Sequence, residues 1–426
     1  MSKNRTYALV LAMLIGTGSQ AQVMTLRSVL DTIRTSHPVI RMYDNDIRSM
    51  DEAAKGARSS MPTQLGTGFF MTPYDPSWWK ADPGMPGMRG NPGMGSFMVS
   101  GEQMFPNRKK LDADEAYMKA MSSSEKERKN ATLNELLAEA KLNYFEWVLL
   151  RRRIGVLREN EKILDFMIRN AEIRYRNNME KISAYYKAKA ALGDVKNMKL
   201  MYESDIRERR IRLNALMGRK AGTPLEIDTS YRIRDFADIE FDSTLFYGNR
   251  SDLKAIDRQI DVARLKMETE RASLKPQFGV KYDHMFGFGG SPMLFTMMGM
   301  VRVPLFAGAS KMSKANVESL KWKTRSLQAQ KEMLVNEYSG MAYGMRNELE
   351  LKMSQMKLYE EEIIPALRNN YRTMQLAYEQ NTGELFMLYD AWETLNMKQL
   401  EYLKLVEDAL RLQVSIERLI EKTNLS

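Results

Sequence analysis

Methionine is the residue whose number and spacing could support chemistry in this chain. The sequence has 34 methionines and no cysteine, and Met85, Met88 and Met94 recur in Pro-Gly-Met triplets of a segment with no apolar core to fill. Thioethers are soft ligands that suit Cu(I) and, by the same softness, Ag(I). We therefore consider these three methionines candidate soft-metal contacts. The alternative is that methionine only fills irregular apolar surface.

The sequence contains few residues that could serve in acid–base or nucleophilic catalysis. The only histidines are His37 and His284, and neither stands at a metal-ligand or catalytic-triad spacing. His37 precedes Pro38, as at the start of a helix, and His284 falls near the end of an expected strand. We therefore expect both histidines to be structural, and we expect no enzymatic activity and no cofactor.

The first 21 residues have the pattern of a secretory signal peptide. Lys3 and Arg5 precede an apolar segment from Tyr7 to Ile15, and Ser19-Gln20-Ala21 offers small residues for cleavage. We expect residues 1–21 to be removed and the mature chain to leave the cytoplasm. After this segment no run of about eighteen apolar residues occurs, so a chain that spans a membrane must do so with strands.

The net charge of +10 does not indicate a nucleic-acid partner. Basic clusters such as Arg151-Arg152-Arg153 lie in helical patterns that also carry glutamate and aspartate, which is typical of solvated helix faces. No groove-reading motif accompanies the charge. We therefore expect no nucleic acid among the partners.

The chain contains two copies of one unit. Arg58 to Gly66 pairs with Arg271 to Gly279, and Tyr175-Arg176-Asn177-Asn178 pairs with Tyr378-Glu379-Gln380-Asn381. In each copy a helical segment precedes a β-hairpin and two long helices. The predicted boundaries are 22–218 for the first repeat, 219–248 for the linking segment and 249–426 for the second repeat.

The long helical segments carry apolar residues at coiled-coil spacing, for example Ile364, Leu367 and Tyr371. Nothing from Arg108 to Asn177 interrupts a helix, which would reach roughly 105 Å at ~1.5 Å per residue. Helices of that length pack side by side. A cytoplasmic coiled-coil rod would also explain them, but it would not explain the signal peptide or the hairpins.

The hairpins alternate apolar and other residues as membrane strands do. Phe278, Val280 and Tyr282 are one such row, and the glycines before Pro292 mark a turn. The predicted strands are 65–71, 97–104, 277–286 and 293–303. Four strands cannot close a barrel, and open edges are not tolerated in lipid. Three chains would give twelve strands, an even number that leaves a lumen.

The sequence resembles the TolC family of outer-membrane factors over essentially the whole mature chain. The residues that carry the resemblance are Pro304-Leu305-Phe306 after the second hairpin, Ile363-Ile364-Pro365 within a long helix, and the tip from Tyr378 to Ala391. Leu213 to Gly218, followed by Gly222-Thr223-Pro224-Leu225, is similar to the heavy-metal efflux branch.

The resemblance implies a mainly α fold with a small β part. Three chains would form a twelve-stranded transmembrane barrel in the outer membrane, four strands from each, and the barrel would continue as an α-helical coiled-coil tunnel in the periplasm. A periplasmic adaptor and an inner-membrane efflux pump would be its partners beside outer-membrane lipid. The chain would conduct substrate without chemistry.

The resemblance also implies a docking role for the two turns between the long helices. The residues concerned are Asn178, Met179, Glu180 and Lys181 at the first tip and Asn381, Thr382, Gly383 and Glu384 at the second. The family usually has glycine where this chain has Asn178 and Asn381. Asparagine tolerates the left-handed backbone that reverses a helix, so we expect that conformation at both positions.

A constriction of the tunnel is the other site that the resemblance implies. Relatives often carry two carboxylates one helical turn apart after the second tip, where this chain has Met387 and Asp390. The corresponding place in the first copy holds Ser183 and Ala184. We expect Ser183, Met387 and Asp390 to line the constriction with a reduced acidic ring. Alternatively, Asp390 is a solvated helix residue.

The leading hypothesis is therefore an exit duct of a tripartite efflux system that passes metal cations such as copper or silver. The same duct serving drugs or a secreted polypeptide is the second hypothesis. A structural coiled-coil protein is the third.

Overall fold

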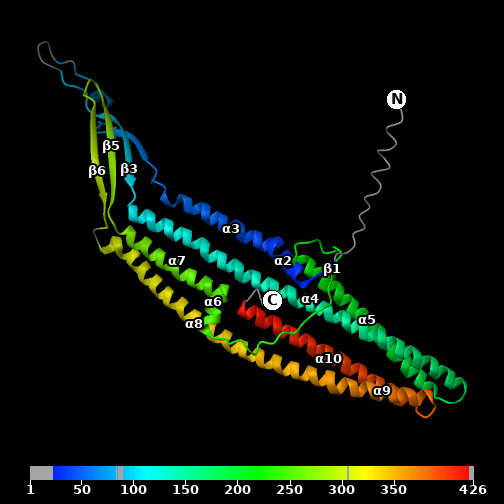
Figure 1. Ribbon diagram of the computed structural model, residues 1–426. Helices are drawn as coiled ribbons and strands as arrows, with labels where there is room; N and C mark the ends of the chain where they lie inside the picture. Colours follow the sequence, from blue (N-terminus) through cyan, green and yellow to red (C-terminus); the bar gives the residue numbers. More distant parts are fainter. Residues whose placement is uncertain (1–22, 83, 85–89, 305–306, 422–426) are drawn as a thin grey trace, which may run out of the picture. The chain divides into compact units, whose positions relative to one another are not determined.

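A computed structural model describes residues 23–82, 84, 90–304 and 307–421. The predicted signal peptide, the two methionines Met85 and Met88, and the Leu305-Phe306 pair lie outside the described residues. Figure 1 shows the order of the elements along the chain.

Helix, hairpin and two long helices occur twice. The first half contains β1 (Val23–Met24), α2 (Leu26–Ser36), α3 (Pro38–Lys55), η2 (Gly56–Arg58), β2 (Gln64–Phe70), η3 (Pro76–Trp79), β3 (Ser96–Phe105), α4 (Arg108–Arg176) and α5 (Ile182–Leu216). The second half contains β4 (Glu226–Ile227), α6 (Ser243–Asn249), α7 (Ser251–Ser273), β5 (Gln277–Gly287), β6 (Leu294–Arg302), α8 (Ala307–Leu358), η4 (Tyr359–Ile363), α9 (Ile364–Glu379) and α10 (Leu385–Ile420). The long helix expected from residue 108 is α4, with 69 residues, and the four expected strands are β2, β3, β5 and β6. These predictions are confirmed.

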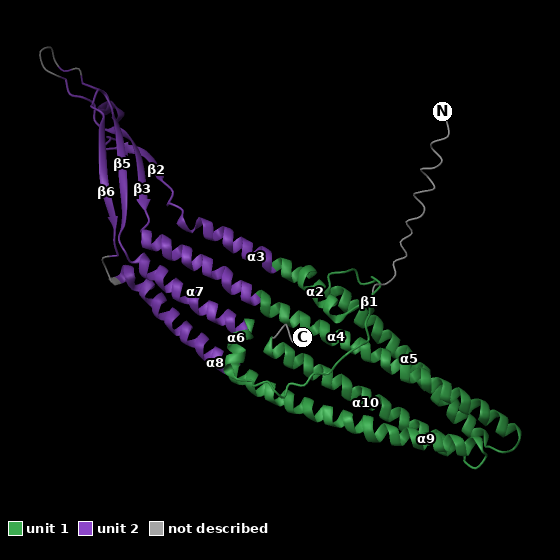
Figure 2. Ribbon diagram, in the orientation of Figure 1, with its two compact units in different colours: residues 1–42, 129–251, 335–426 green, residues 43–128, 252–334 purple. Residues whose placement is uncertain are grey.

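The described residues divide into two compact units, coloured separately in Figure 2. Unit 1 combines residues 1–42, 129–251 and 335–426, and unit 2 combines residues 43–128 and 252–334. Each unit takes segments from both halves of the chain, so the compact units are not the two predicted repeats.

Unit 1 is helical apart from the short parallel pair of β1 and β4. Towards the two tips, α4, α5, α9 and α10 share one apolar core, because each helix turns an apolar stripe inwards. Leu164 of α4, Leu192 of α5, Tyr371 of α9 and Leu388 of α10 are among its buried members. None of the described helices carries an apolar stretch long enough to cross a membrane.

The passage from α8 to α9 is continuous but contains one turn of π-helix, η4. Pro365 follows in the first turn of α9. Proline lacks the backbone N–H, and its ring collides with the carbonyl four residues earlier in a regular α-helix. The wider π turn lets the chain pass this point without a break, so Ile363-Ile364-Pro365 lies within a helical segment as expected.

Unit 2 contains a four-stranded antiparallel sheet in the order β2-β3-β5-β6. The two hairpins join through β3 and β5, where Phe97 lies opposite Phe286 and Gly101 lies opposite Tyr282. The edges of the sheet are therefore β2 and β6. Within the chain, no other described strand pairs with either edge.

Candidate functional site

The first tip, between α4 and α5, is a hydrogen-bonded reversal centred on Asn178. The backbone of Asn178 is left-handed, with φ 56°. Its N–H donates to the Tyr175 carbonyl at 3.0 Å, and the Met179 N–H donates to the Arg174 carbonyl at 2.8 Å. These two bonds are those of a Schellman motif, which satisfies the last carbonyls of a helix. The left-handed backbone expected at Asn178 is confirmed.

The second tip, between α9 and α10, repeats this arrangement. Asn381 has φ 59° and donates its N–H to the Tyr378 carbonyl at 3.2 Å, while the Thr382 N–H reaches the Ala377 carbonyl at 2.9 Å. Gly383 also donates to Ala377, at 3.0 Å. A side chain on Gly383 would meet the Ala377 Cβ at 3.1 Å, so only glycine fits this approach without a shift. The prediction for Asn381 is confirmed as well.

The predicted docking residues lie on these turns and mostly face outwards from unit 1. Asn178, Met179, Lys181, Asn381, Thr382 and Glu384 are exposed, and Glu180 and Gly383 are half-buried. The turns thus present a compact set of amides, charges and one thioether on a backbone that its own hydrogen bonds hold fixed. Docking itself stays a prediction.

An arginine–tyrosine contact joins the two tips to each other. The Arg174 guanidinium donates to the Tyr378 carbonyl and lies 3.8 Å from the centre of the Tyr378 ring. Burial raises the pKa of Tyr378, while Arg174 acts in the opposite direction and Glu180 adds to the rise. The ring therefore stays neutral at physiological pH. Tyr378 is thus buried as a packing residue at the end of α9, and its contact with Arg174 was not predicted from the sequence.

The predicted constriction residues occupy the first two turns of α5 and α10. Ser183, Met387 and Asp390 are all exposed in unit 1. The matching hydrogen bonds of the two tips align Met387 with Ala184 and Asp390 with Lys187. Ala184, one of the two counterparts expected from the sequence, therefore matches Met387, whereas the counterpart of Asp390 is Lys187 and Ser183 lies one residue before Ala184.

Lys187 is the residue that sequence reasoning missed at this end of unit 1. Its Nζ lies 4.4 Å from the centre of the Phe386 ring and 4.2 Å from that of the Tyr389 ring, which are cation–π distances. The core side of α10 carries Leu388 and Trp392. Asp390 lies on the exposed side, a position that suits both a tunnel lining and a solvated helix residue.

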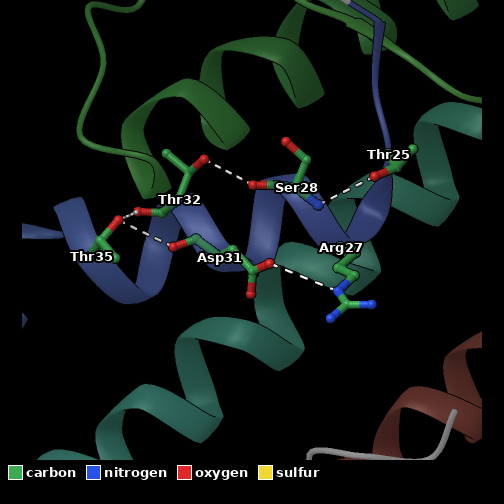
Figure 3. A pocket seen from close by; sticks show the side chains of 6 residues that line it. All are labelled: Thr25, Arg27, Ser28, Asp31, Thr32 and Thr35. Carbon is green, nitrogen blue, oxygen red and sulfur yellow. Dashed lines mark hydrogen bonds and ion pairs between the residues drawn. The ribbon is translucent and has the colours of Figure 1, made fainter.

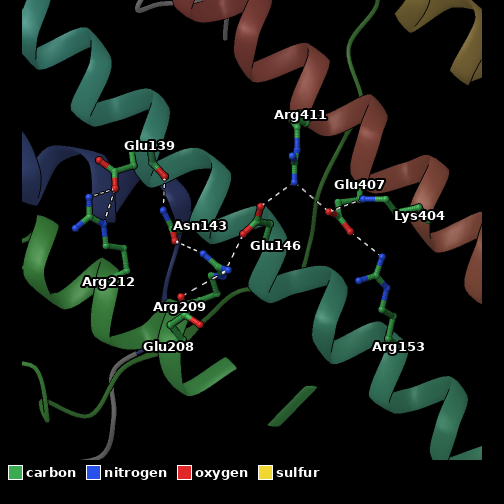
Figure 4. A network of polar contacts seen from close by, with 10 residues as sticks. All are labelled: Glu139, Asn143, Glu146, Arg153, Glu208, Arg209, Arg212, Lys404, Glu407 and Arg411. Atoms are coloured by element: carbon green, nitrogen blue, oxygen red, sulfur yellow. Dashed lines mark hydrogen bonds and ion pairs between the residues drawn. The ribbon is translucent and has the colours of Figure 1, made fainter. Parts of the chain in front are cut away.

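Further along unit 1, a polar network connects α4, α5 and α10 (Figure 4). Glu146 of α4 forms an ion pair with Arg209 of α5 and accepts a hydrogen bond from Arg411 of α10, both at 3.1 Å. A single carboxylate thereby links three helices. Both partners of Glu146 are arginines that also form ion pairs with other carboxylates. We therefore interpret the network as structural.

Glu407 of α10 is the second centre of this network. It accepts from Arg153 at 2.7 Å, from Lys404 at 3.0 Å and from Arg411 at 3.2 Å. Burial raises the pKa of Glu407, but the Lys404 hydrogen bond and the Arg153 charge together outweigh burial and hold that pKa below its usual value. Within the part of the chain that the structure describes, no three histidine, aspartate or glutamate side chains gather as metal ligands do.

An open pocket on α2 carries no site (Figure 3). Its lining residues are Thr25, Arg27, Ser28, Asp31, Thr32 and Thr35. The threonine hydroxyls are already engaged: Thr25 caps the helix through the Ser28 N–H, Thr32 donates to the Ser28 carbonyl at 2.8 Å, and Thr35 donates to the Asp31 carbonyl at 3.2 Å. Asp31 lies 4.0 Å from Arg27. The groups spread along one helix and do not converge on a ligand.

In unit 2 the sheet has two different faces. Alternate residues of a strand point to opposite sides, and the pairing registers place one set of apolar side chains together. This apolar face consists of Leu65, Phe69, Phe97, Val99, Phe105, Phe278, Val280, Tyr282, Phe286, Phe295, Met297 and Val301. Most of these large side chains are exposed on the isolated chain. An exposed apolar patch of this extent is rare on the surface of a soluble monomeric protein.

The opposite side, here called the mixed face, combines polar side chains with methionine. Lys281 lies opposite Glu102 of β3, and its Nζ is 3.5 Å from Asp283. Asp283 is only 4% exposed and lies opposite Ser100 and Thr296. A charged and hydroxyl-bearing row therefore crosses the sheet on this face. The alternation expected from the sequence is confirmed, and the registers show which residues share each face.

The segment between β2 and β3 is fixed to the turn between β5 and β6. The Trp79 ring stacks on Phe288 with centroids 5.1 Å apart, and its Nε1 donates to the Pro73 carbonyl at 2.8 Å. Gly93 donates to the Gly289 carbonyl at 3.0 Å. Met94 is exposed beside these contacts, whereas Met85 and Met88 lie outside the described residues. Metal contact by these methionines remains a prediction.

Solved outer-membrane channels share this fold. No protein-family model and no curated protein sequence matches the chain. The outer-membrane channel OprN aligns with a TM-score of 0.73 at 14% identity, over 93% of this chain and 89% of its own. The channel protein CusC gives 0.72 at 11%, over 94% and 92%. The outer membrane protein VceC from Vibrio cholerae gives 0.70 at 15%, over 93% and 96%.

Proposed function

We propose that the chain is one protomer of a trimeric exit duct in the outer membrane, which passively conducts substrate delivered by an inner-membrane pump. The observation that carries this proposal is a sheet with an exposed apolar face and two unpaired edges. In lipid every backbone polar group must be paired, so the edges need partners. Three copies, with β6 of each beside β2 of the next, would close twelve strands.

The two faces of the sheet support this arrangement. A closed barrel places its apolar face towards lipid and its polar side chains in the lumen. Side chains on the inner side of a closed sheet crowd one another, and Asp283 and Met104 of the mixed face are indeed buried. OprN and VceC are outer-membrane proteins, which supports the same location for this chain.

The helical tips of unit 1 are the proposed docking surface for a periplasmic adaptor. Their Schellman turns fix the backbone before any partner binds, which reduces the entropic cost of binding. In the trimer, Ser183, Met387 and Asp390 would line a constriction. Three copies of Asp390 would form an acidic ring of the kind that selects cations in other channels.

Metal cations such as copper or silver are the substrates that we favour. The support is the abundance of methionine and the resemblance of Leu213 to Leu225 to the heavy-metal efflux branch. Drugs and a secreted polypeptide are the alternatives for the same duct. A purely structural coiled-coil protein is a weaker candidate, because it would leave the apolar face of the sheet without a use.

Membrane fractionation and conductance measurements test the duct. The mature protein should purify from outer membranes with detergent as a trimer and should conduct ions in planar bilayers. A monomer that needs no detergent and gives no conductance would overturn the proposal.

The docking surface has its own matched test. Met179 at the tip and Met201 within α5 are both 57% exposed. Replacement Met179→Ala should weaken cross-linking to the adaptor at the tip, whereas Met201→Ala should leave it unchanged. Equal effects of the two replacements would argue against docking at the tips.

A further inference from the structure

We propose that the mixed face of the sheet contains a binding site for a soft monovalent cation, with the thioethers of Met104 and Met300 as its central ligands. The proposal concerns residues other than the loop methionines considered above. It rests on the proposed function in one respect only, namely that the mixed face lines a lumen.

The distribution of methionine over the two faces is the first observation. Five of the six methionines in the strands of the four-stranded sheet lie on the mixed face: Met98, Met104, Met285, Met298 and Met300. Only Met297 lies on the apolar face. If methionine served to fill lipid-facing surface, it would collect on the apolar face, where phenylalanine, leucine and valine are found instead. The methionines thus follow the polar side of the sheet.

Gly279 is the point at which two thioethers meet. It lies opposite Met104 on one side and opposite Met300 on the other. A Cβ on Gly279 would stand 2.3 Å from the Met104 Sδ and 3.3 Å from the Met300 Cε. The missing side chain therefore leaves a space that the two methionines enter from both neighbouring strands. Met104 is 8% exposed, so its sulfur is sheltered from water.

A second methionine pair lies on the same face. Met98 stands directly opposite Met285, and side chains opposite each other in an antiparallel pair have Cβ atoms about 4.5–5.5 Å apart. Successive rows on one face are roughly 6.7 Å apart. Two rows, one with Glu102, Lys281 and Met298 and one with Ser100, Asp283 and Thr296, separate the two methionine pairs, which are therefore about 20 Å apart. A soft ion that moves along the barrel axis would meet the Met298 thioether between them.

Asp283 lies one row from the Met98–Met285 pair and two rows from Gly279 on the same face, and it brings a carboxylate to the path between the two methionine pairs. Its Oδ1 is buried and accepts no hydrogen bond from the described residues, although Lys281 lies 3.5 Å away as an ion-pair partner. A buried carboxylate with spare acceptor capacity stabilises a passing cation. Neutral thioethers bind such an ion without holding it as firmly as thiolates would, which suits a site that must release what it binds.

The ligand chemistry points to Cu(I) or Ag(I) in preference to harder ions. The chain has no cysteine, and His284 lies on the apolar face, opposite Val99. Thioethers are thus the soft ligands that the mixed face offers. Thioether sulfur favours Cu(I), and Ag(I) by the same softness, over Zn(II) or Mg(II).

Silver binding to the purified full-length protein in detergent tests the site. The double replacement Met104→Leu with Met300→Leu keeps side-chain volume nearly constant. It should weaken Ag(I) binding in calorimetry at least about tenfold, and the single replacement Met104→Leu should show a part of this loss. Met297→Leu, on the apolar face of the same strand as Met300, should bind as the unaltered protein does. Zn(II) should give no comparable binding.

The outcomes separate the site from the duct. Conductance without silver binding, or silver binding that the double replacement leaves unchanged, would overturn the site alone. If the unaltered protein neither forms trimers nor conducts, the proposed function fails first. Cells that carry the double replacement should lose silver tolerance while drug tolerance stays as it was, and an equal loss of both would also count against the site.

Discussion

At the scale of single residues, the two tips show how backbone conformation dictates residue type. Asn381 adopts φ 59°, a region that costs most L-residues about 1–2 kcal/mol. Replacement Asn381→Val should lower the free energy of unfolding by about that amount, because a β-branched side chain fits this region worst. Thermal unfolding and adaptor cross-linking would measure the effect. Asn381→Gly is the control and should keep the turn; equal stability of all three proteins would contradict the argument.

Asn160 is a buried polar residue that connects α4 with α10. Its Oδ1 accepts from Trp392 Nε1 at 2.8 Å, and its Nδ2 donates to Asn396 Oδ1 at 2.6 Å. Replacement Asn160→Leu removes both hydrogen bonds and leaves the buried indole N–H of Trp392 unpaired, which costs about 1–3 kcal/mol. Denaturant unfolding should therefore show a clear loss of stability.

A double-mutant cycle provides the control for this pair. Trp392→Phe removes the indole donor, so Asn160→Leu should cost less in that background than alone. Strictly additive losses would mean that the hydrogen bond contributes nothing.

Residue types revealed some of these contacts and hid others. Asparagine at the expected helix ends was enough to predict a left-handed backbone at Asn178 and Asn381. Arg174 and Lys187 could not be found in this way, because their ring contacts depend on how segments far apart in sequence pack together. The position of Gly279 between Met104 and Met300 was not predicted either, because it depends on the pairing registers of β3, β5 and β6.

At the scale of elements, periodicity predicted the long helix α4 and all four strands closely. The π turn in η4 was not predicted, since Pro365 indicates only that a regular helix is disturbed. Which way the chain relieves that disturbance, by a kink, a break or a wider turn, depends on its packing. The same limit applies to the ion-pair network, where the sequence shows charges without their partners.

The contacts of Glu407 make the packing of α4 against α10 sensitive to pH. The pKa of this carboxyl is lower in the folded protein than its ordinary 4.5. A depressed pKa contributes stability above the unfolded-state pKa, and this contribution is lost as pH falls through the folded-state pKa. We therefore expect the free energy of unfolding to decline below about pH 4.5.

Comparison of variants separates the contribution of Glu407 to the pH dependence of stability from that of the other carboxyl groups. Glu407→Gln should be less stable at neutral pH and should lose less stability on acidification than the unaltered protein. Parallel curves for Glu407→Gln and the unaltered protein would exclude Glu407 as a source of the acid sensitivity.

At the scale of the whole molecule, the main consequence is that one chain does not complete its own sheet. The helices pack around apolar cores within the chain. The sheet, by contrast, ends in β2 and β6, whose outward N–H and C=O groups pair with no other described strand of the chain. That the sheet is incomplete in one chain was predicted from the number of strands alone. The neighbour of each edge could not be predicted, because in the proposed trimer it would belong to another copy.

Disulfide trapping identifies the neighbour, since the chain has no cysteine of its own. Thr67→Cys on β2 can be combined with Met297→Cys or Gly299→Cys on β6. Within one chain these edges are three strand spacings apart, roughly 14 Å, which is too far for a disulfide. Oxidation in membranes should give covalent dimers and trimers and nothing larger, because three copies close the ring.

As a control, Val99→Cys on the interior strand β3 with Met297→Cys should give only monomers. Cross-linked ladders beyond the trimer would favour an open assembly, and a lack of cross-links across a full panel of β2 and β6 positions would mean that these edges do not meet.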